Sequence, residues 1–197
     1  KGLAVQNFPF RYVYTGIGKT VKRALPLKTI RRIKEIPLHP GADFARNMFL
    51  FSFYTRGMSF VDMSYLKKTD LKNGNLVYRR RKTGQRLVIR WESCMQDIVD
   101  KYDTGDSPYL LPIIRHSGMD ERKQYLNMGH FVNRHLKNIG TRLNLDIMLT
   151  MYVSRHTWAS AAKVKNIPTA VISEALGHGS EMTTRIYLAS LDNGIVD

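Results

Sequence analysis

The stretch ALGHGSEMTTRIY, residues 175–187, places a histidine and a tyrosine on opposite sides of a tight turn. Gly177 is typical of a residue that ends a helix, because glycine adopts the left-handed conformation without steric cost. Ser180 is suited to cap a following helix through its hydroxyl oxygen. The stretch therefore predicts helices at 168–176 and 180–190, with His178 at the end of the first and Tyr187 on the second.

The chain before this stretch changes its hydrophobic period. Apolar residues from Phe44 to Tyr54 recur at three- and four-residue steps, which predicts a strongly buried helix after Pro40. Alternation at LVYRRRKTGQRLVIRW, residues 76–91, predicts a β-hairpin. Other expected elements are helices at 25–36, 59–68, 92–102, 128–143 and 155–165, the last capped by Ser154, and a short strand near 69–71. The predicted fold class is mainly α with a small antiparallel β-sheet (α+β).

Positive charge is the strongest feature of the composition. The 197 residues include 31 Lys and Arg against 16 Asp and Glu, which gives a net charge of +15. A domain of this size tolerates such a charge most readily when its partner is a polyanion, and double-stranded DNA is the leading candidate. The sequence contains no membrane-spanning run or signal-peptide pattern, so we expect a cytoplasmic, nucleoid-associated protein. The single cysteine, Cys94, excludes an internal disulfide and a thiolate metal cluster.

Four polar residues stand in separate motifs, and their order is informative. They are Lys82 in RRRKTGQRLVI, Arg155 in YVSRHTWAS, His178 in LGHGS and Tyr187 in TTRIYLAS. Together they resemble the catalytic domain of the tyrosine recombinase (phage integrase) family, from roughly residue 25 to the end. The resemblance implies that family's catalytic-domain fold for residues 25–197. Residues 1–24 are then expected to be a linker or a remnant from a missing upstream DNA-binding domain.

The chemistry of phosphodiester cleavage accounts for these residue types. Attack on the phosphate places additional negative charge on its non-bridging oxygens, so the site needs fixed donors, and Arg155 and His178 fit that role. Tyr187 is expected to be the nucleophile, since a cationic pocket favours its phenolate. Lys82, on a hairpin turn, is expected to protonate the leaving 5′-oxygen as general acid. This chemistry needs neither a metal nor another cofactor.

The sequence departs from the family pattern at two positions. Tyr152 stands where the family usually has the histidine of H-x-x-R, and it offers a hydroxyl donor without a positive charge. Ser59 occupies the position of the family's first arginine. Arg56 lies one helical turn earlier, so we predict that it supplies the missing guanidinium, with Asp62 holding an arginine in place. These departures resemble integrases of mobile elements from the Bacteroides group.

The resemblance implies a site-specific DNA recombinase (integrase) that integrates or excises a mobile element through a 3′-phosphotyrosyl intermediate. It also implies a homotetramer in the synaptic complex, a monomeric fragment in isolation, and DNA-bending accessory proteins as further partners. The C-terminal tail LDNGIVD, residues 191–197, would dock on a neighbouring protomer. Two alternatives stay open: DNA relaxation of the type IB topoisomerase kind, and a non-enzymatic DNA-binding module with a helix-turn-helix at 155–176.

Overall fold

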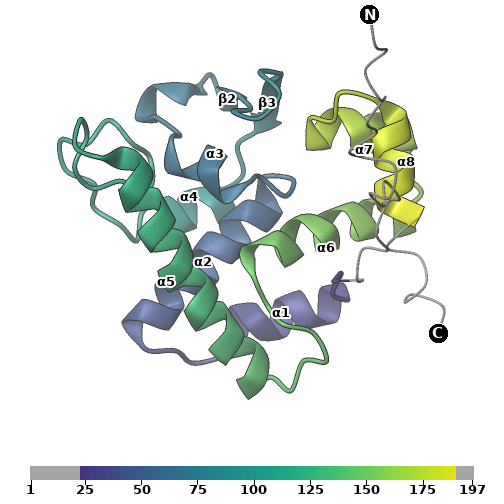
Figure 1. Cartoon of the computed structure of the whole chain (residues 1–197), viewed down its shortest axis with the longest axis horizontal. Coiled ribbons are helices and arrows are strands. Elements are labelled where there is room, and N and C mark those ends of the chain that lie inside the picture. The colour runs from purple at the N-terminus through teal and green to yellow at the C-terminus, as the bar shows by residue number, and fades with distance from the viewer. Residues whose placement is uncertain (1–22, 190–197) are drawn as a thin grey trace, which may run out of the picture.

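The computed structural model describes residues 23–189, so most of the expected 1–24 linker and the tail from residue 190 lie outside the described range. Eight α-helices, one 3-10 turn and three strands follow one another within it (Figure 1). Their bounds are α1 Leu27–Glu35, α2 Pro40–Tyr54, α3 Phe60–Ser64, η1 Lys68–Asp70, β1 Leu71–Lys72, β2 Asn75–Arg79, β3 Arg86–Arg90, α4 Ser93–Val99, α5 Glu121–Arg142, α6 Met151–Val164, α7 Thr169–Leu176 and α8 Glu181–Ala189. The α+β class predicted from the sequence is confirmed.

The helix α2 is the centre of the main hydrophobic core and contacts both α5 and α6. Pro40 occupies its first turn, where a missing N–H costs no helical hydrogen bond. Phe49 and Phe51 are fully buried, and each such side chain contributes roughly 2 kcal/mol through removal of apolar surface from water. The buried helix expected after Pro40 is confirmed.

The three strands form an antiparallel sheet in the order β1-β2-β3. Leu76 pairs with Ile89 and Tyr78 with Leu87, and these four side chains are buried on one face. The turn between β2 and β3 is closed by two backbone hydrogen bonds: the Arg80 N–H donates to the Gln85 carbonyl at 2.8 Å, and the Gly84 N–H donates to the Arg80 carbonyl at 2.7 Å. The predicted hairpin is confirmed. The short strand expected near 69–71 is β1. It begins only at Leu71, because residues 68–70 form the 3-10 turn.

The last helices have a separate small core. Ala159, Ala162, Ile172, Leu176 and Leu188 form it, and the tyrosine of the opening motif is partly buried against it. In Figure 1, α6 extends from the main core toward α7 and α8, which pack on each other. Gly177 has φ 63°, so it ends α7 in the left-handed conformation as expected. The two helices predicted from this stretch are therefore present.

Several helix boundaries differ from those expected. The helix α6 begins at Met151, and Ser154 lies inside it as a buried residue whose hydroxyl donates to the Met151 carbonyl and contacts the Ser52 hydroxyl at 2.6 Å. Ser154 therefore joins α6 to α2 instead of capping a helix. The helix expected at 59–68 ends at Ser64, and the one expected at 92–102 is limited to Ser93–Val99.

The helix expected at 128–143 is longer at its N-terminus and begins at Glu121. The Asp120 side chain caps it by accepting a hydrogen bond from the Lys123 N–H at 3.0 Å. Polar residues fill the first turn, so the apolar period does not reveal it. No helix within residues 23–189 is long and apolar enough to cross a membrane.

Candidate active site

Arg155 is a buried arginine of α6 that joins two distant segments. Its Nη1 donates to the Gly57 carbonyl at 2.9 Å, and its Nη2 donates to the Leu176 carbonyl at 2.5 Å. A Cβ added at Gly57 would lie 2.6 Å from the Arg155 Cα, so only glycine permits this approach. Burial lowers the pKa of Arg155, and the charge of Arg80 lowers it further. An arginine in a protein nevertheless keeps its charge at neutral pH.

His178 follows the helix-ending glycine and lies against Arg155. Its Nε2 is 3.2 Å from Arg155 Nη2, and its Nδ1 is 2.7 Å from the Thr184 hydroxyl. Because arginine has no acceptor, His178 Nε2 accepts this hydrogen bond, which assigns the proton to Nδ1. Burial, Arg155 and other cations lower the pKa of His178 to about 4. The free site therefore holds a neutral imidazole, and we correct the expectation that His178 stands ready as a donor.

Tyr187, on α8, is in contact with two histidine rings. His156 stacks on it with ring centroids 5.0 Å apart, and His178 meets it edge-on at 5.6 Å. Burial raises the pKa of Tyr187, the neighbouring Tyr152 raises it further, and Arg155 opposes the rise. We predicted a cationic pocket that favours the phenolate. The cation is present, but desolvation outweighs it, so the tyrosine of the free protein is a protonated phenol.

His156 is a residue of this site that the sequence analysis missed. It is fully buried on α6 between two tyrosines, with Tyr152 edge-on at a centroid distance of 4.5 Å. Burial and the charges of Arg23 and Arg155 lower its pKa to about 4. A usable signal existed, because Tyr152 and His156 stand four residues apart and share one helix face. The contact with Tyr187 could not be read from that spacing.

The β2–β3 hairpin brings two cations to the same region. Lys82 lies exposed on the turn, as expected. Arg80 is half-buried, and its Nη1 donates to the Gly177 carbonyl at 2.5 Å. The sequence analysis treated Arg80 only as one of three consecutive arginines in a strand. Its contact with the turn next to His178 is a finding of the structure.

Two of the predicted site residues, Asp62 and Arg56, lie in the segment after α2. The Asp62 carboxylate accepts from the Ser59 hydroxyl at 2.6 Å and from the Arg81 backbone N–H at 2.8 Å. It therefore fixes the hairpin by its backbone, whereas we expected it to hold an arginine side chain. Arg56 has φ 61° and lies near Tyr78, where burial and Asp62 raise the pKa of the phenol and Arg155, Arg80 and Arg56 oppose the rise.

A cavity of about 810 Å³ lies between these elements. Six of the eight predicted site residues line it: Ser59, Lys82, Tyr152, Arg155, His178 and Tyr187. Arg80 lines it as well. Among the described residues, Arg56 and Asp62 are not part of this lining. The catalytic role that we predicted for Arg56 stays a prediction.

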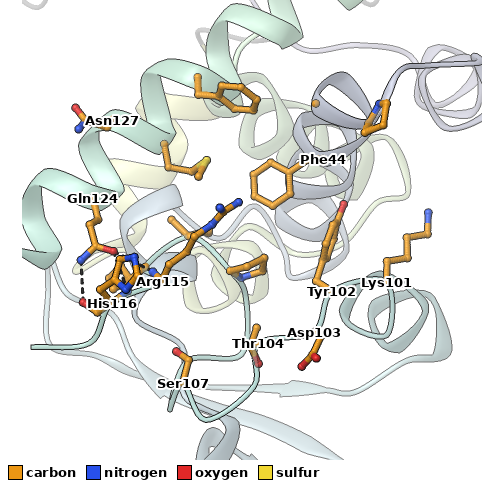
Figure 2. A pocket seen from close by; sticks show the side chains of 17 residues that line it. Phe44, Lys101, Tyr102, Asp103, Thr104, Ser107, Arg115, His116, Gln124 and Asn127 are labelled. Carbon is orange, nitrogen blue, oxygen red and sulfur yellow. Dashed lines mark hydrogen bonds between the residues drawn. The ribbon is translucent and has the colours of Figure 1, made fainter. Parts of the chain in front are cut away.

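A second hollow, of about 990 Å³, lies between α2, α5 and the segment after α4 (Figure 2). Arg115 and Phe44 lie on its wall, and the Gln124 side chain donates to the His116 carbonyl at 2.8 Å. It contains neither the tyrosine nor the histidine of the opening motif. The candidate active site is therefore the smaller cavity around Tyr187.

The two buried histidines predict how stability depends on pH. Both have a pKa near 4 in the folded protein against about 6.5 in an unfolded chain. Below pH 6.5 the unfolded chain binds protons at these positions while the folded protein does not, so stability falls as the pH drops from 6.5 toward 4. Urea unfolding between pH 7.5 and 5 should show this loss. His156→Gln should flatten the dependence, whereas the exposed His116→Gln should leave it unchanged.

Comparison with known proteins gives relatives of one kind, although no family model matches the chain. "Tyrosine recombinase XerA" of Pyrococcus furiosus is 26% identical over 176 residues, which cover 87% of this chain and 58% of the relative. Among solved structures, XerH site-specific recombinase bound to difH substrate aligns with a TM-score of 0.65 and 18% identity, covering 89% of this chain and 53% of that one. A lambda integrase dimer bound to a COC′ core site aligns with a TM-score of 0.61 and 16% identity, covering 92% and 63%.

This chain spans less than two thirds of each of these proteins. The motifs converge on one cavity, and both the curated relative and the solved structures are recombinases. The chain is therefore similar in sequence to tyrosine recombinases, and it shares the fold of the XerH and lambda integrase structures.

Proposed function

We propose that this protein is the catalytic domain of a site-specific DNA recombinase that integrates or excises a mobile element. Its substrate is double-stranded DNA, to which the net charge of +15 attracts it. The observation that carries the proposal is the convergence of Tyr187, Arg155, His178 and Lys82 on one cavity. A tyrosine beside oriented cations is what phosphoryl transfer to a protein hydroxyl requires.

In the first step, the Tyr187 hydroxyl oxygen attacks the scissile phosphorus and the bond to the 5′-oxygen breaks. His178 Nε2, which carries no proton in the free site, accepts the phenolic proton. The anionic phosphate raises the proton affinity of this imidazole, so the imidazolium then stabilises the pentavalent transition state together with Arg155. Lys82 donates a proton to the leaving 5′-oxygen, which departs as a hydroxyl.

The second step reverses these roles on a different strand. A 5′-hydroxyl of a partner duplex attacks the 3′-phosphotyrosyl bond, Lys82 accepts its proton, and Tyr187 leaves as a phenol reprotonated by His178. The number of phosphodiester bonds is unchanged, so no energy source is needed. Four protomers on two duplexes would supply the four cleavages of a complete exchange, assisted by DNA-bending proteins, within the nucleoid.

Trapping of the covalent intermediate tests the proposal without knowledge of the target site. The probe is a pool of duplexes with a central 5′-bridging phosphorothiolate between randomised flanks. The released thiol rejoins poorly, so a phosphotyrosyl adduct accumulates and survives denaturing electrophoresis. We expect adducts whose DNA shares a sequence motif, and absence of any adduct from this pool would contradict the proposal.

Two further assays separate the proposal from its alternatives. A recombinase transfers the trapped strand to a second duplex that carries the selected motif. A type IB topoisomerase instead relaxes supercoiled plasmids of any sequence. A non-enzymatic helix-turn-helix module retards the selected DNA in a native gel and forms no adduct.

The general-acid assignment predicts a rescue by a better leaving group. Lys82→Ala should slow cleavage of the selected phosphodiester duplex by roughly 10²- to 10⁴-fold, the usual contribution of one general acid. The same variant should cleave the 5′-bridging phosphorothiolate at nearly the wild-type rate, because a thiolate departs without a proton. Lys101→Ala, which removes an exposed lysine of the other hollow, is the matched control and should leave both rates unchanged. Failure of the sulfur substrate to restore cleavage would remove Lys82 from this role.

A further inference from the structure

The cavity presents a shortage of donors for the phosphate. Charge develops on two non-bridging oxygens during attack, and each needs fixed donors. Arg155 has five N–H groups, of which three donate to Gly57, Leu176 and His178. Both hydrogens of Nη2 are thereby used in the free site. The remaining two N–H groups of Arg155 belong to Nε and Nη1, so one arginine covers the phosphate incompletely.

Arg80 brings a second guanidinium to the cavity. It lines the same wall as His178 and Arg155, and its charge lowers the pKa of both. One of its five N–H groups donates to the Gly177 carbonyl. The other donors of a guanidinium lie in a plane suited to a phosphate oxygen pair.

The position of Arg80 is fixed before DNA arrives. Its backbone N–H and carbonyl both take part in the hydrogen bonds that close the hairpin turn, to Gln85 and from Gly84. The Asp62 carboxylate holds the next residue by the backbone N–H of Arg81. A Cβ at Gly177 would lie 3.0 Å from Arg80 Cδ, so the side-chain stem packs closely on this glycine. Such preorganisation is what a transition-state donor needs.

The neighbouring arginines are differently engaged. The exposed Arg79 donates from Nη1 to the Gly84 carbonyl at 3.1 Å, and the Arg81 guanidinium stacks over the Tyr65 ring at 3.8 Å. Arg56, which the sequence favoured, does not line the cavity within the described residues. Arg79 and Arg81 thus have other contacts, and Arg56 lies outside the lining of this cavity.

We propose that Arg80 is a catalytic residue that contacts a non-bridging oxygen of the scissile phosphate and supplies the guanidinium absent at Ser59. The inference rests on the proposed function. It assigns the second arginine of the site to the hairpin, so the hairpin would supply both a phosphate donor and the proton for the leaving group.

The experiment measures single-turnover adduct formation by the whole chain at saturating DNA, on two versions of the selected duplex. One has an ordinary scissile phosphodiester. In the other, a methyl group replaces one non-bridging oxygen, which removes the negative charge. Wild-type protein must first form the adduct on the ordinary duplex. If it does not, the proposed function fails before Arg80 is tested.

On the ordinary duplex, Arg80→Ala should be roughly 10²- to 10³-fold slower than wild type, the scale for loss of one oriented transition-state donor. On the neutral methylphosphonate duplex, the difference should shrink to less than about tenfold, because less charge needs compensation. Arg79→Ala is the matched control and should stay near the wild-type rate on both duplexes. Arg56→Ala is measured beside it as the competing candidate for the same role. A thermal unfolding midpoint close to that of wild type would exclude a folding defect in Arg80→Ala.

Three outcomes would overturn the inference. Arg80→Ala could cleave the ordinary duplex near the wild-type rate. It could lose the same factor on both duplexes, which would show that it acts by shaping the site and not by compensating charge. Finally, Arg56→Ala could show the charge-dependent loss, which would return the role to the residue that the sequence predicted.

Discussion

Tyr187→Phe is expected to abolish the covalent protein–DNA adduct while leaving the fold and DNA binding intact. The variant removes one hydroxyl and keeps the ring, so the stack on His156 and the edge contact with His178 survive. The adduct needs a nucleophilic oxygen at this point of the cavity, and the phenylalanine ring offers none. Denaturing electrophoresis with the phosphorothiolate duplex measures the loss.

Tyr152→Phe is the matched control for this experiment. Tyr152 is the other tyrosine in the lining of the cavity, and its side chain is 51% exposed. The Tyr152→Phe variant should still form the adduct. Its rate of adduct formation should fall by at most about tenfold, for the loss of one hydrogen-bond donor. An adduct in Tyr187→Phe together with none in Tyr152→Phe would exchange the two assignments.

Gly57→Ala is expected to destabilise the fold by about 2 to 5 kcal/mol, because two costs add. Gly57 has φ +73°, which costs a residue with a Cβ about 1 to 2 kcal/mol. The new methyl group would also lie within 3 Å of the Arg155 Cα, Cβ and Cγ. Forcing extra atoms into such a packed region typically costs about 1 to 3 kcal/mol. Urea unfolding monitored by circular dichroism measures the total.

Gly74→Ala separates these two costs. Gly74 has φ +70°, and an added Cβ would meet nothing within 4 Å. This variant should therefore show only the backbone cost of about 1 to 2 kcal/mol. The difference between the two variants reports the close approach of the α2–α3 turn to Arg155. Equal destabilisation in both would mean that α6 moves away from residue 57 at no cost.

The elements that pack by simple periodicity were predictable from the sequence. The buried stripe of α2 and the alternation of β2 and β3 are visible because each has one buried face. The predicted helix boundaries were wrong where polar residues occupy helical positions because of tertiary contacts. Ser154 is typical of a helix cap, but its hydroxyl bonds across to Ser52 of α2, and no local pattern distinguishes these two uses of a serine.

The main residues of the candidate site were predictable from the sequence, but the contacts of the neighbouring side chains were not. Tyr187, His178, Arg155 and Lys82 follow from motifs, and all four line one cavity. The roles of the three consecutive arginines were not predictable. Arg79 donates to a backbone carbonyl, Arg80 lines the cavity, and Arg81 stacks on an aromatic ring. The twist of the hairpin and the position of α7 decide between them, and neither is written in the local sequence.

Protonation states were the least predictable property of the site. The sequence suggested a cationic pocket that favours the Tyr187 phenolate and a donor at His178. Burial outweighs the cation at the tyrosine, and it acts with the cations to lower the pKa of the histidine. Desolvation depends on how completely other segments cover a group. Coverage of Tyr187 comes from α6 and α8, which meet only in the folded protein.

The separate small core beneath α8 determines when Tyr187, the proposed nucleophile, is held in place. Five buried residues hold α7 and α8 on the end of α6, while the main core is far larger and lies elsewhere. A unit with so little buried apolar surface opens at a lower free energy than the whole domain unfolds. Withdrawal of Tyr187 from its two histidines is therefore a local equilibrium. Under the proposed function, the cleavage rate would be the intrinsic rate multiplied by the docked fraction of α8, and a partner that contacts α8 would change that rate without touching the phosphate.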